Sequence, residues 1–196
     1  MMNNFNSEKI LKFIEILFRY NKEVNLFSRK LSFENVERIV NETILFGNYV
    51  KNNNIIDAGS GNGFIGIPLA IIYKKKKVIL VETKEKKVFY LNKLVGELNL
   101  KNVKIFLGGI INYFNENKIN KDVSLVSRGF PNNYNLIKFL KESFVDEVVL
   151  ITVEDKIKKI SYSVDNIKKY VYNIPSKDKI KIVKLEKVSR GTIKKM

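Results

Sequence analysis

The sequence contains no cysteine, no histidine and no tryptophan. Disulfides, thiolate nucleophiles and zinc sites built from cysteine or histidine are therefore excluded. A Ser-His-Asp triad is excluded as well, because its general base is a histidine. Catalysis by this chain must use a cofactor's own reactivity, carboxylates, lysine, arginine, tyrosine or backbone amides, and we predict no metal site.

Long hydrophobic runs are also missing. The longest, residues 55–73, holds four glycines together with Asp57, Asn62 and Pro68, so a membrane span is not expected. The first residues lack the basic region and apolar core of a signal peptide. With 196 residues, 45% of them hydrophobic and 29% charged, the chain can bury one sizeable core. We expect a cytoplasmic protein that has no membrane partner.

Acidic residues are scarce relative to basic ones, which leaves a net charge of +16. This balance indicates a nucleic-acid partner. The abundance of Lys, Asn and Ile is also typical of an A/T-rich coding sequence, so charge alone does not decide the question. The basic excess is concentrated in residues 156–196, which contain thirteen Lys or Arg against three Asp or Glu.

Hydrophobic periodicity predicts an N-terminal helical extension over residues 1–50 and one α/β domain over residues 51–196. The extension holds a helix over 7–21 capped by Ser7, and a second helix that begins after Ser32 and fades by Val50. Alternating patterns then predict a mostly parallel sheet with helices on both faces. Its strands are predicted at 54–58, 77–82, 102–107, 122–127 and 147–153, and its helices at 66–73, 84–99, 110–117 and 133–144. Residues 179–185 alternate in polarity, which predicts an antiparallel edge strand.

The most informative motif is Asp57-Ala58-Gly59-Ser60-Gly61-Asn62-Gly63, directly after Asn54-Ile55-Ile56. An apolar strand that ends in an acid and breaks into alternating glycines predicts a strand, a tight loop and a helix. Glycine permits backbone angles that are closed to residues with a Cβ, and it lets a ligand approach the backbone. In α/β proteins such a loop binds a nucleoside-containing cofactor at the carboxyl end of a parallel sheet.

Two cofactors fit the glycines. Gly61-Asn62-Gly63-Phe64-Ile65-Gly66 matches the dinucleotide fingerprint, with Glu82 at the expected distance for a ribose acid. The register from Asp57 to Gly63 instead matches the loop of S-adenosylmethionine (SAM) methyltransferases, in which an acid closing the second strand binds the ribose hydroxyls. The dinucleotide register would require a strand through Gly59 and Ser60, which are poor strand residues. SAM is therefore favoured over NAD(P) or FAD, and a glycine turn without a ligand is the remaining reading.

Residue types and motifs that the sequence lacks also limit which atom can accept the methyl group. Cytosine-C5 enzymes need a cysteine, and the loop after the fourth strand, residues 126–131, lacks the Pro-Pro motif usual in enzymes that methylate exocyclic amines. Guanine N7 carries a free lone pair and no proton, so its methylation needs alignment and desolvation rather than a general base. Arg128, beside the predicted cofactor cleft, would hold the neighbouring base oxygen or a phosphate. The alternative is an arginine on the surface or at a helix start.

Several segments resemble the RsmG (GidB) methyltransferase family, which makes 7-methylguanosine in the 530 loop of small-subunit ribosomal RNA. Residues 20–26 are similar to its Trp-Asn-Lys-x-x-Asn-Leu segment. Residues 57–69 resemble its cofactor loop, including the Gly-Ile-Pro-Leu tail. Glu82 with Lys86-Lys87, Ser127-Arg128 with Phe130, and the tail Arg190-Gly191-Thr192 resemble further family segments.

The resemblance implies a Rossmann-like class I SAM-dependent methyltransferase with ribosomal RNA as its partner, and we expect a monomer. SAM, which becomes S-adenosylhomocysteine (SAH), is expected at Asp57, Gly59, Ser60, Gly61, Asn62, Gly63, Phe64, Glu82, Gly109, Ile110 and Arg128. Arg128 is the expected catalytic residue, and the expected RNA contacts are Asn25, Arg29, Lys30 and Arg190. The chain departs from the family pattern at Phe27, Ile39, Gly108-Gly109-Ile110-Ile111 and Thr152-Val153. A nicotinamide-dependent oxidoreductase and a non-enzymatic RNA-binding protein are the alternatives.

Overall fold

The structure is a computed structural model that describes residues 4–117, 122–129, 140, 145–153, 167–173 and 180–187. Two helices come first, α1 (Asn4–Val24) and α2 (Phe33–Phe46), followed by the short 3₁₀ helix η1 (Gly47–Tyr49). Strands and helices then alternate: β1 (Asn54–Ala58), α3 (Gly66–Ile72), β2 (Lys77–Glu82), α4 (Glu85–Glu97), β3 (Val103–Leu107), α5 (Ile110–Glu116) and β4 (Val123–Arg128). The strands β5 (Glu147–Val153), β6 (Ile167–Asn173) and β7 (Ile180–Lys187) complete the elements of the described residues.

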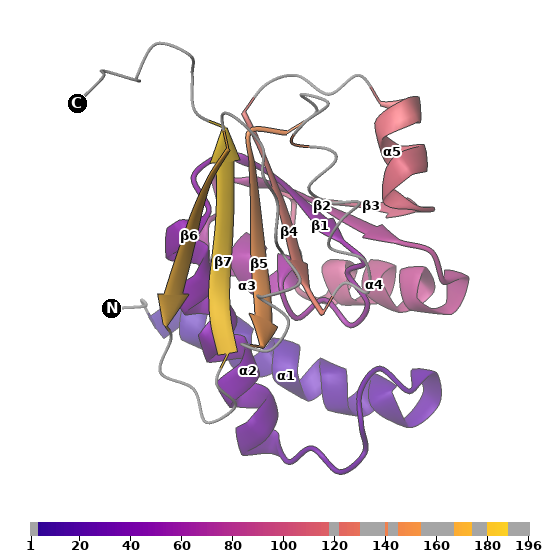
Figure 1. Cartoon of the computed structure of the whole chain (residues 1–196). Coiled ribbons are helices and arrows are strands. Elements are labelled where there is room, and N and C mark those ends of the chain that lie inside the picture. The colour runs from indigo at the N-terminus through magenta and orange to yellow at the C-terminus, as the bar shows by residue number, and fades with distance from the viewer. Residues whose placement is uncertain are drawn as a thin grey trace, which may run out of the picture.

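The strands form one sheet in the order β3-β2-β1-β4-β5-β7-β6 (Figure 1). The five strands from β3 to β5 are parallel, whereas β7 pairs antiparallel with both β5 and β6. The mostly parallel sheet is therefore confirmed. Because β1 lies between β2 and β4, the strand order reverses beside β1. The carboxyl ends of β1 and β4 are the edge at which α/β sheets bind ligands.

Each face of the sheet has its own hydrophobic cluster, because neighbouring strand residues point to opposite faces. Ile55 belongs to the cluster formed with α1, α2, α3 and α4, and Ile56 to the cluster that includes α5. Helices on both faces were expected and are found (Figure 1). The extension and the sheet share the first cluster, and the proposed domain division at residue 50 stays a prediction.

Three details of the predicted elements are wrong. Helix α1 begins at Asn4, so Ser7 lies inside it rather than capping it. The strand expected at an edge, β7, lies between β5 and β6. The true edge strand, β6, was not predicted, because only Ile167, Tyr170 and Tyr172 of its seven residues are partly buried and it has no apolar run. The predicted helix at 133–144 lies outside the described residues except for residue 140.

Other local expectations are met. The Ser32 hydroxyl accepts a hydrogen bond from the Asn35 amide and caps α2. Pro68 lies in the first turn of α3, where its missing N–H leaves no helical bond unmade. None of the helices within the described ranges is long and apolar enough to cross a membrane.

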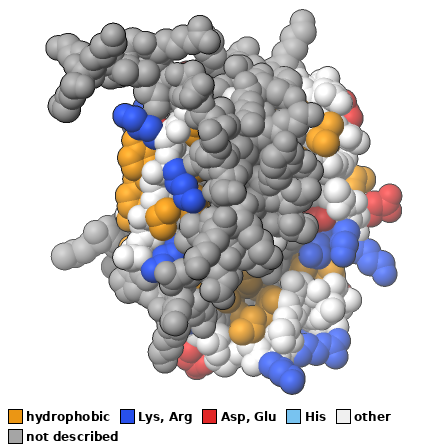
Figure 2. Space-filling model, in the orientation of Figure 1, with side chains coloured by type: hydrophobic (Ala, Val, Ile, Leu, Met, Phe, Trp, Pro, Cys, Tyr) orange, Lys and Arg blue, Asp and Glu red, His pale blue; other side chains and the backbone are white. Residues whose placement is uncertain are grey.

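Among the described residues that Figure 2 colours, the basic side chains do not form a single patch on this face. Lys and Arg side chains stand there in several separate groups, with hydrophobic side chains between them. Charge alone therefore does not locate a binding surface on this face, and the pockets must be considered instead.

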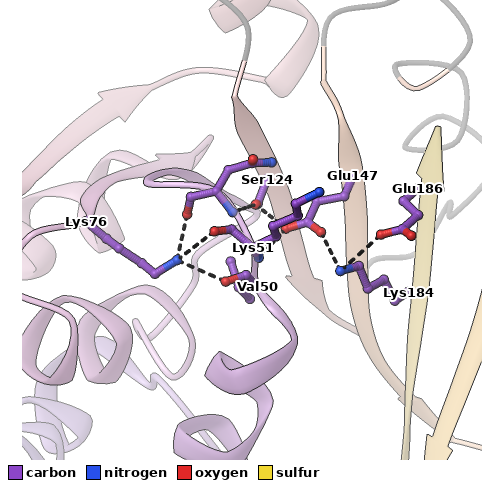
Figure 3. Close-up of polar contacts among 8 residues, drawn as sticks. Val50, Lys51, Lys76, Ser124, Glu147, Lys184 and Glu186 are labelled. Carbon is purple, nitrogen blue, oxygen red and sulfur yellow. Dashed lines mark hydrogen bonds and ion pairs between the residues drawn. The ribbon is translucent and has the colours of Figure 1, made fainter. Parts of the chain in front are cut away.

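The linker between the extension and the sheet is fixed at the amino edge of β4 and β5 (Figure 3). Buried Glu147 accepts from the Lys51 amide at 2.6 Å and from the Ser124 hydroxyl, and it pairs with Lys184 at 2.9 Å. Burial lowers the pKa of Lys184, but the hydrogen bonds and charges of Glu147 and Glu186 together outweigh burial and raise it. On the other side, the Lys76 ammonium donates to the carbonyls of residues 50 and 52 at 2.9 and 2.7 Å. The extension is thereby fixed to the sheet away from the carboxyl edge.

Candidate cofactor and substrate site

The loop after β1 depends on glycine. Gly59, Gly61 and Gly63 have φ values of 72°, 58° and 81°, in the left-handed region that favours glycine. A Cβ at Gly63 would also lie 2.8 Å from Ile67 Cγ1. The amides of Gly59 and Ser60 both donate to the Val81 carbonyl at 3.0 Å, so the loop is tied to the end of β2. The result is a stretch of bare backbone at the carboxyl end of the sheet.

Asp57 shapes this loop from below. Its side chain is 2% exposed, and Oδ2 accepts from the Gly66 amide at 2.9 Å at the start of α3. Burial raises the pKa of the Asp57 carboxyl to about 7, with hydrogen bonds from Gly66 and Ser60 acting against it and the charge of Glu82 adding to it. The buried acid thus fixes where the strand ends and the helix begins.

Glu82, the last residue of β2, closes the loop from the side. Its Oε2 accepts from the Gly61 amide at 2.8 Å. Its Oε1 accepts from the amides of Thr83 and Lys84 at 2.8 and 2.9 Å. A carboxylate has about four acceptor sites, so Oε2 keeps capacity for a further donor such as a hydroxyl.

A cavity of about 250 Å³ lies against the loop and is called the cofactor pocket below. Its lining comes from the loop, from the start of α4 and from the end of β4: Asp57, Gly59, Ser60, Gly61, Asn62, Phe64, Ile65, Lys87 and Arg128. Seven of the eleven predicted SAM residues therefore line this cavity, namely Arg128 and six residues from the end of β1 and the loop. Ile65 was not predicted, and Lys87 entered only through the resemblance.

The other four predicted SAM residues do not line this cavity. Gly63 is buried within the loop, and Glu82 binds the loop through the Gly61 amide. Gly109 and Ile110 form the start of α5, beyond the carboxyl end of β3. The Gly108 amide donates to the Glu82 carbonyl at 2.9 Å, which places the start of α5 next to Glu82.

Arg128 is held by an acid that the sequence did not single out. Its Nη2 lies 3.2 Å from Glu42 Oε2, and Arg38 Nη1 lies 2.7 Å from Glu42 Oε1. The Glu42 side chain is 2% exposed and the Arg128 side chain 24%. Arg128 therefore belongs to a partly buried ion network that lines the cofactor pocket, and it is neither a surface arginine nor a helix start. The sequence signal that could have identified Glu42 was its position among apolar residues of α2, four residues after Arg38.

The predicted RNA residues lie between α1 and α2, except Arg190, which is outside the described residues. Asn25, Arg29 and Lys30 are exposed, and Asn25 has a φ of 51°. This segment contacts the glycine loop, because Asn62 Nδ2 donates to the Leu26 carbonyl at 3.5 Å.

The positions that depart from the family pattern are also placed by the structure. The Phe27 ring lies 5.9 Å from the Phe64 ring between centroids, so it packs against the glycine loop. Ile39 packs against the hydrophobic cluster, and Thr152 is 8% exposed in β5. Ile111, by contrast, is 54% exposed on α5. The effect of these departures on activity stays a prediction.

Strand β1 ends at Ala58, so Gly59 and Ser60 are loop residues. The dinucleotide register would need them in the strand. The observed end of β1 therefore supports the SAM register.

Comparison with known proteins agrees with this geometry. A family model described as GidB, rRNA small subunit methyltransferase G, matches residues 6–180. The ribosomal RNA small subunit methyltransferase G of Brachyspira hyodysenteriae is 34% identical over 174 residues, covering 87% of this chain and 82% of the relative. The protein of the same name from Mycoplasma genitalium is 39% identical over 104 residues, covering 50% of this chain and 53% of the relative.

Solved structures support the fold. An O-methyltransferase from Bacillus cereus in complex with SAH has a TM-score of 0.65 at 14% identity, covering 90% of this chain and 91% of that one. An rRNA methylase from Streptococcus thermophilus has a TM-score of 0.58 at 18% identity, covering 78% of this chain and 98% of that one. The fold is thus that of the Rossmann-like class I SAM-dependent methyltransferases. On the extent of the family match, the chain belongs to the rRNA small subunit methyltransferase G (GidB) family.

Proposed function

We propose that this protein transfers a methyl group from SAM to N7 of a guanine in the 530 loop of small-subunit ribosomal RNA. The observation that carries the proposal is one cavity that joins a carboxylate-closed glycine loop to a fixed arginine. The family match and the names of the relatives support the ribosomal substrate.

The residues of the pocket fit SAM. Glu82 Oε2 would accept from the ribose hydroxyls, since it has one amide partner and spare acceptor capacity. The backbone of Gly59 and Gly61 would lie against the methionine part, where a side chain would obstruct the approach. The start of α5, at Gly109 and Ile110, would face the adenine. When bound, SAM supplies an electrophilic methyl group on its sulfonium sulfur.

Arg128 would position the acceptor base. Guanine N7 has a lone pair and no proton to lose, so the site needs no general base, which suits a chain without histidine or cysteine. The Arg128 guanidinium would donate to the neighbouring base oxygen or to a phosphate. Glu42 fixes that guanidinium from behind, so it is oriented before the RNA arrives.

The remaining features are proposed more broadly. The net charge of +16 favours binding to RNA, with Asn25, Arg29, Lys30 and Arg190 as contacts outside the cofactor pocket. We place the enzyme in the cytoplasm as a monomer, with a helical extension over residues 1–50 and a methyltransferase domain over residues 51–196.

The test compares three proteins in a strain that lacks the gene. We expect the wild type to restore 7-methylguanosine in small-subunit ribosomal RNA, and Arg128→Ala to lower methyl transfer by about a hundredfold or more. The dissociation constant for SAH should change by no more than about threefold in Arg128→Ala, because Glu82 and the loop are untouched. Arg19→Ala is the matched control, since Arg19 is exposed and pairs with Glu97 at the C-terminal end of α4, whereas Lys87 near the start of α4 lines the pocket. Full methylation by Arg128→Ala would refute the role of Arg128.

The oxidoreductase alternative is tested by thermal unfolding. SAH at saturating concentration should raise the Tm, whereas NADH should leave it unchanged. The opposite result would contradict SAM binding.

A further inference from the structure

A second pocket lies at the end of α1, outside the cofactor pocket. It has a volume of about 280 Å³ and is called the N-terminal pocket. Its lining comes from the last turns of α1 and the segment that follows: Phe18, Asn21, Lys22, Phe27, Arg29 and Leu31. The volume is near the lower limit for small-ligand sites, so the pocket suits one small planar group rather than a large ligand.

Asn21 is the polar group built into this pocket. The residue is 6% exposed, and its Oδ1 accepts from the Phe27 amide at 2.9 Å. That bond identifies the oxygen, and the amide nitrogen makes no hydrogen bond within the ranges that the structure describes. This nitrogen is not among the fully buried atoms that lack a partner, so it keeps accessible surface that water or a ligand can reach. Since Asn21 lines the pocket, its nitrogen is available to an acceptor that enters there.

The remaining lining residues combine flat apolar surface with positive charge. Phe18, Phe27 and Leu31 are only partly buried and offer apolar surface, and the two rings lie 5.3 Å apart in an edge-to-face arrangement. Lys22 and Arg29 are exposed at the same cavity. Aromatic faces stack on unpaired bases, amide donors recognise base acceptors, and Lys or Arg contact phosphates. Together these groups match a nucleotide.

The N-terminal pocket is also connected to the cofactor loop. Phe27 lines the pocket on one side and lies 5.9 Å from Phe64 of the cofactor pocket between ring centroids. The neighbouring Leu26 carbonyl accepts from Asn62 of the loop. A strand of RNA with one base in the cofactor pocket could therefore place a nearby nucleotide in the N-terminal pocket.

We infer that the N-terminal pocket binds one unpaired nucleotide of the RNA substrate, close in sequence to the methylated base. This inference rests on the proposed function. The Asn21 amide donates to an acceptor on the base, Phe27 contacts the ring, and Lys22 and Arg29 bind the phosphate. The subsite would select RNA whose loop can unstack two bases at once.

Substitutions at two places test the subsite without removing a core contact. Asn21→Asp keeps the oxygen that accepts from Phe27, replaces the amide donor with an acceptor oxygen and adds a negative charge, so the charge-neutral Asn21→Ser, which also removes the amide donor, is measured beside it. Lys22→Gln with Arg29→Gln removes two exposed positive charges. The matched control is Lys12→Gln with Lys101→Gln, which removes two exposed charges from α1 and from the turn before β3, away from this pocket.

The substrate for the assay is the small ribosomal subunit from a strain that lacks this gene. Three quantities are measured: the KM for the subunit, the dissociation constant for SAH, and the dissociation constant for the extracted RNA by filter binding. We expect the KM and the RNA dissociation constant to rise between about fivefold and a hundredfold in Asn21→Asp and in Asn21→Ser. A similar rise is expected in the double variant, whose salt dependence should also weaken. SAH affinity should stay unchanged.

The outcomes separate the two proposals. Unchanged KM and unchanged RNA binding in all of these variants, with an active wild type, would overturn the subsite and leave the proposed function standing. A weaker affinity for SAH would assign the N-terminal pocket to the cofactor and also overturn the subsite. If the wild type transfers no methyl group, the proposed function fails, and filter binding then decides the subsite alone.

Discussion

The buried carboxyl of Asp57 makes a measurable prediction about stability and pH. Its pKa is about 7 in the folded protein against an ordinary value of 3.8, chiefly because of burial. Between these two pH values the native state binds more protons than the unfolded state, so stability falls as pH rises. The contribution of Asp57 is fully present below the unfolded pKa and is lost as pH rises through the folded pKa.

The size of the effect follows from the two pKa values. We expect the Asp57 contribution to the free energy of unfolding to fall by about 2.5 kcal/mol between about pH 5 and about pH 8. Asn at this position cannot ionise, yet its amide oxygen can still accept from the Gly66 amide. The difference in unfolding free energy, Asp57→Asn minus wild type, should therefore increase by about 2.5 kcal/mol over the same interval.

Urea unfolding followed by far-ultraviolet circular dichroism at several pH values measures this difference. Asp122→Asn is the matched control, because Asp122 is exposed and has a φ of 71°, which Asn tolerates. The control should keep the pH dependence of the wild type. If Asp57→Asn also keeps it, Asp57 is not the group that titrates, and its burial has been given too much weight.

Four further substitutions test other parts of the site and the core. In urea unfolding, Gly66→Ala should lower the free energy of unfolding by about 1–3 kcal/mol, because its Cβ would lie 2.2 Å from Leu80 Cδ2. Gly96→Ala should raise the free energy of unfolding by about 0.5–1 kcal/mol, because its Cβ would have nothing within 4 Å. Glu42→Gln removes the charge facing Arg128 and should lower kcat while the SAH dissociation constant is kept; unchanged kcat would count against an orienting role. Glu147→Gln leaves a lysine charge without its buried partner and should cost about 3 kcal/mol in urea unfolding. If Glu147→Gln also weakened SAH binding by a similar free energy, the amino edge of the sheet would be coupled to the cofactor pocket.

The parallel part of the fold could be predicted because its strands carry their own signal. Strands β1 and β4 are buried on both faces and contain β-branched or aliphatic residues, and the glycine loop marks where β1 ends. The edge strand β6 has a weaker signal, since only three of its seven residues are partly buried and lysines interrupt the pattern. Position within a sheet depends on which strands pair, and local pattern does not contain that information.

The site was predicted in the same uneven way. The loop and Asp57 are local in sequence, and Glu82, which ends the next strand, was expected beside the loop and binds the Gly61 amide. The partner of Arg128 was missed, because Glu42 lies 86 residues earlier and only the fold brings the two together. On α2 the apolar Leu45 is 43% exposed, while Glu42 and Thr43 are buried, so side-chain polarity alone does not identify its buried face. Glu42 is buried against the charges of Arg38 and Arg128, and the contact with Arg128 is visible only in three dimensions.

The contacts across residue 50 show that the N-terminal extension forms part of the site. Glu42 of α2 reaches Arg128 at the end of β4, and the Leu26 carbonyl is bound by Asn62 of the glycine loop. At the other edge of the sheet, the Lys51 amide is fixed by Glu147. A chain that began at residue 51 would keep the glycine loop but lose the acid that orients Arg128. The extension is therefore better understood as a wall of the active site, and variation within it should alter substrate positioning before it alters cofactor binding.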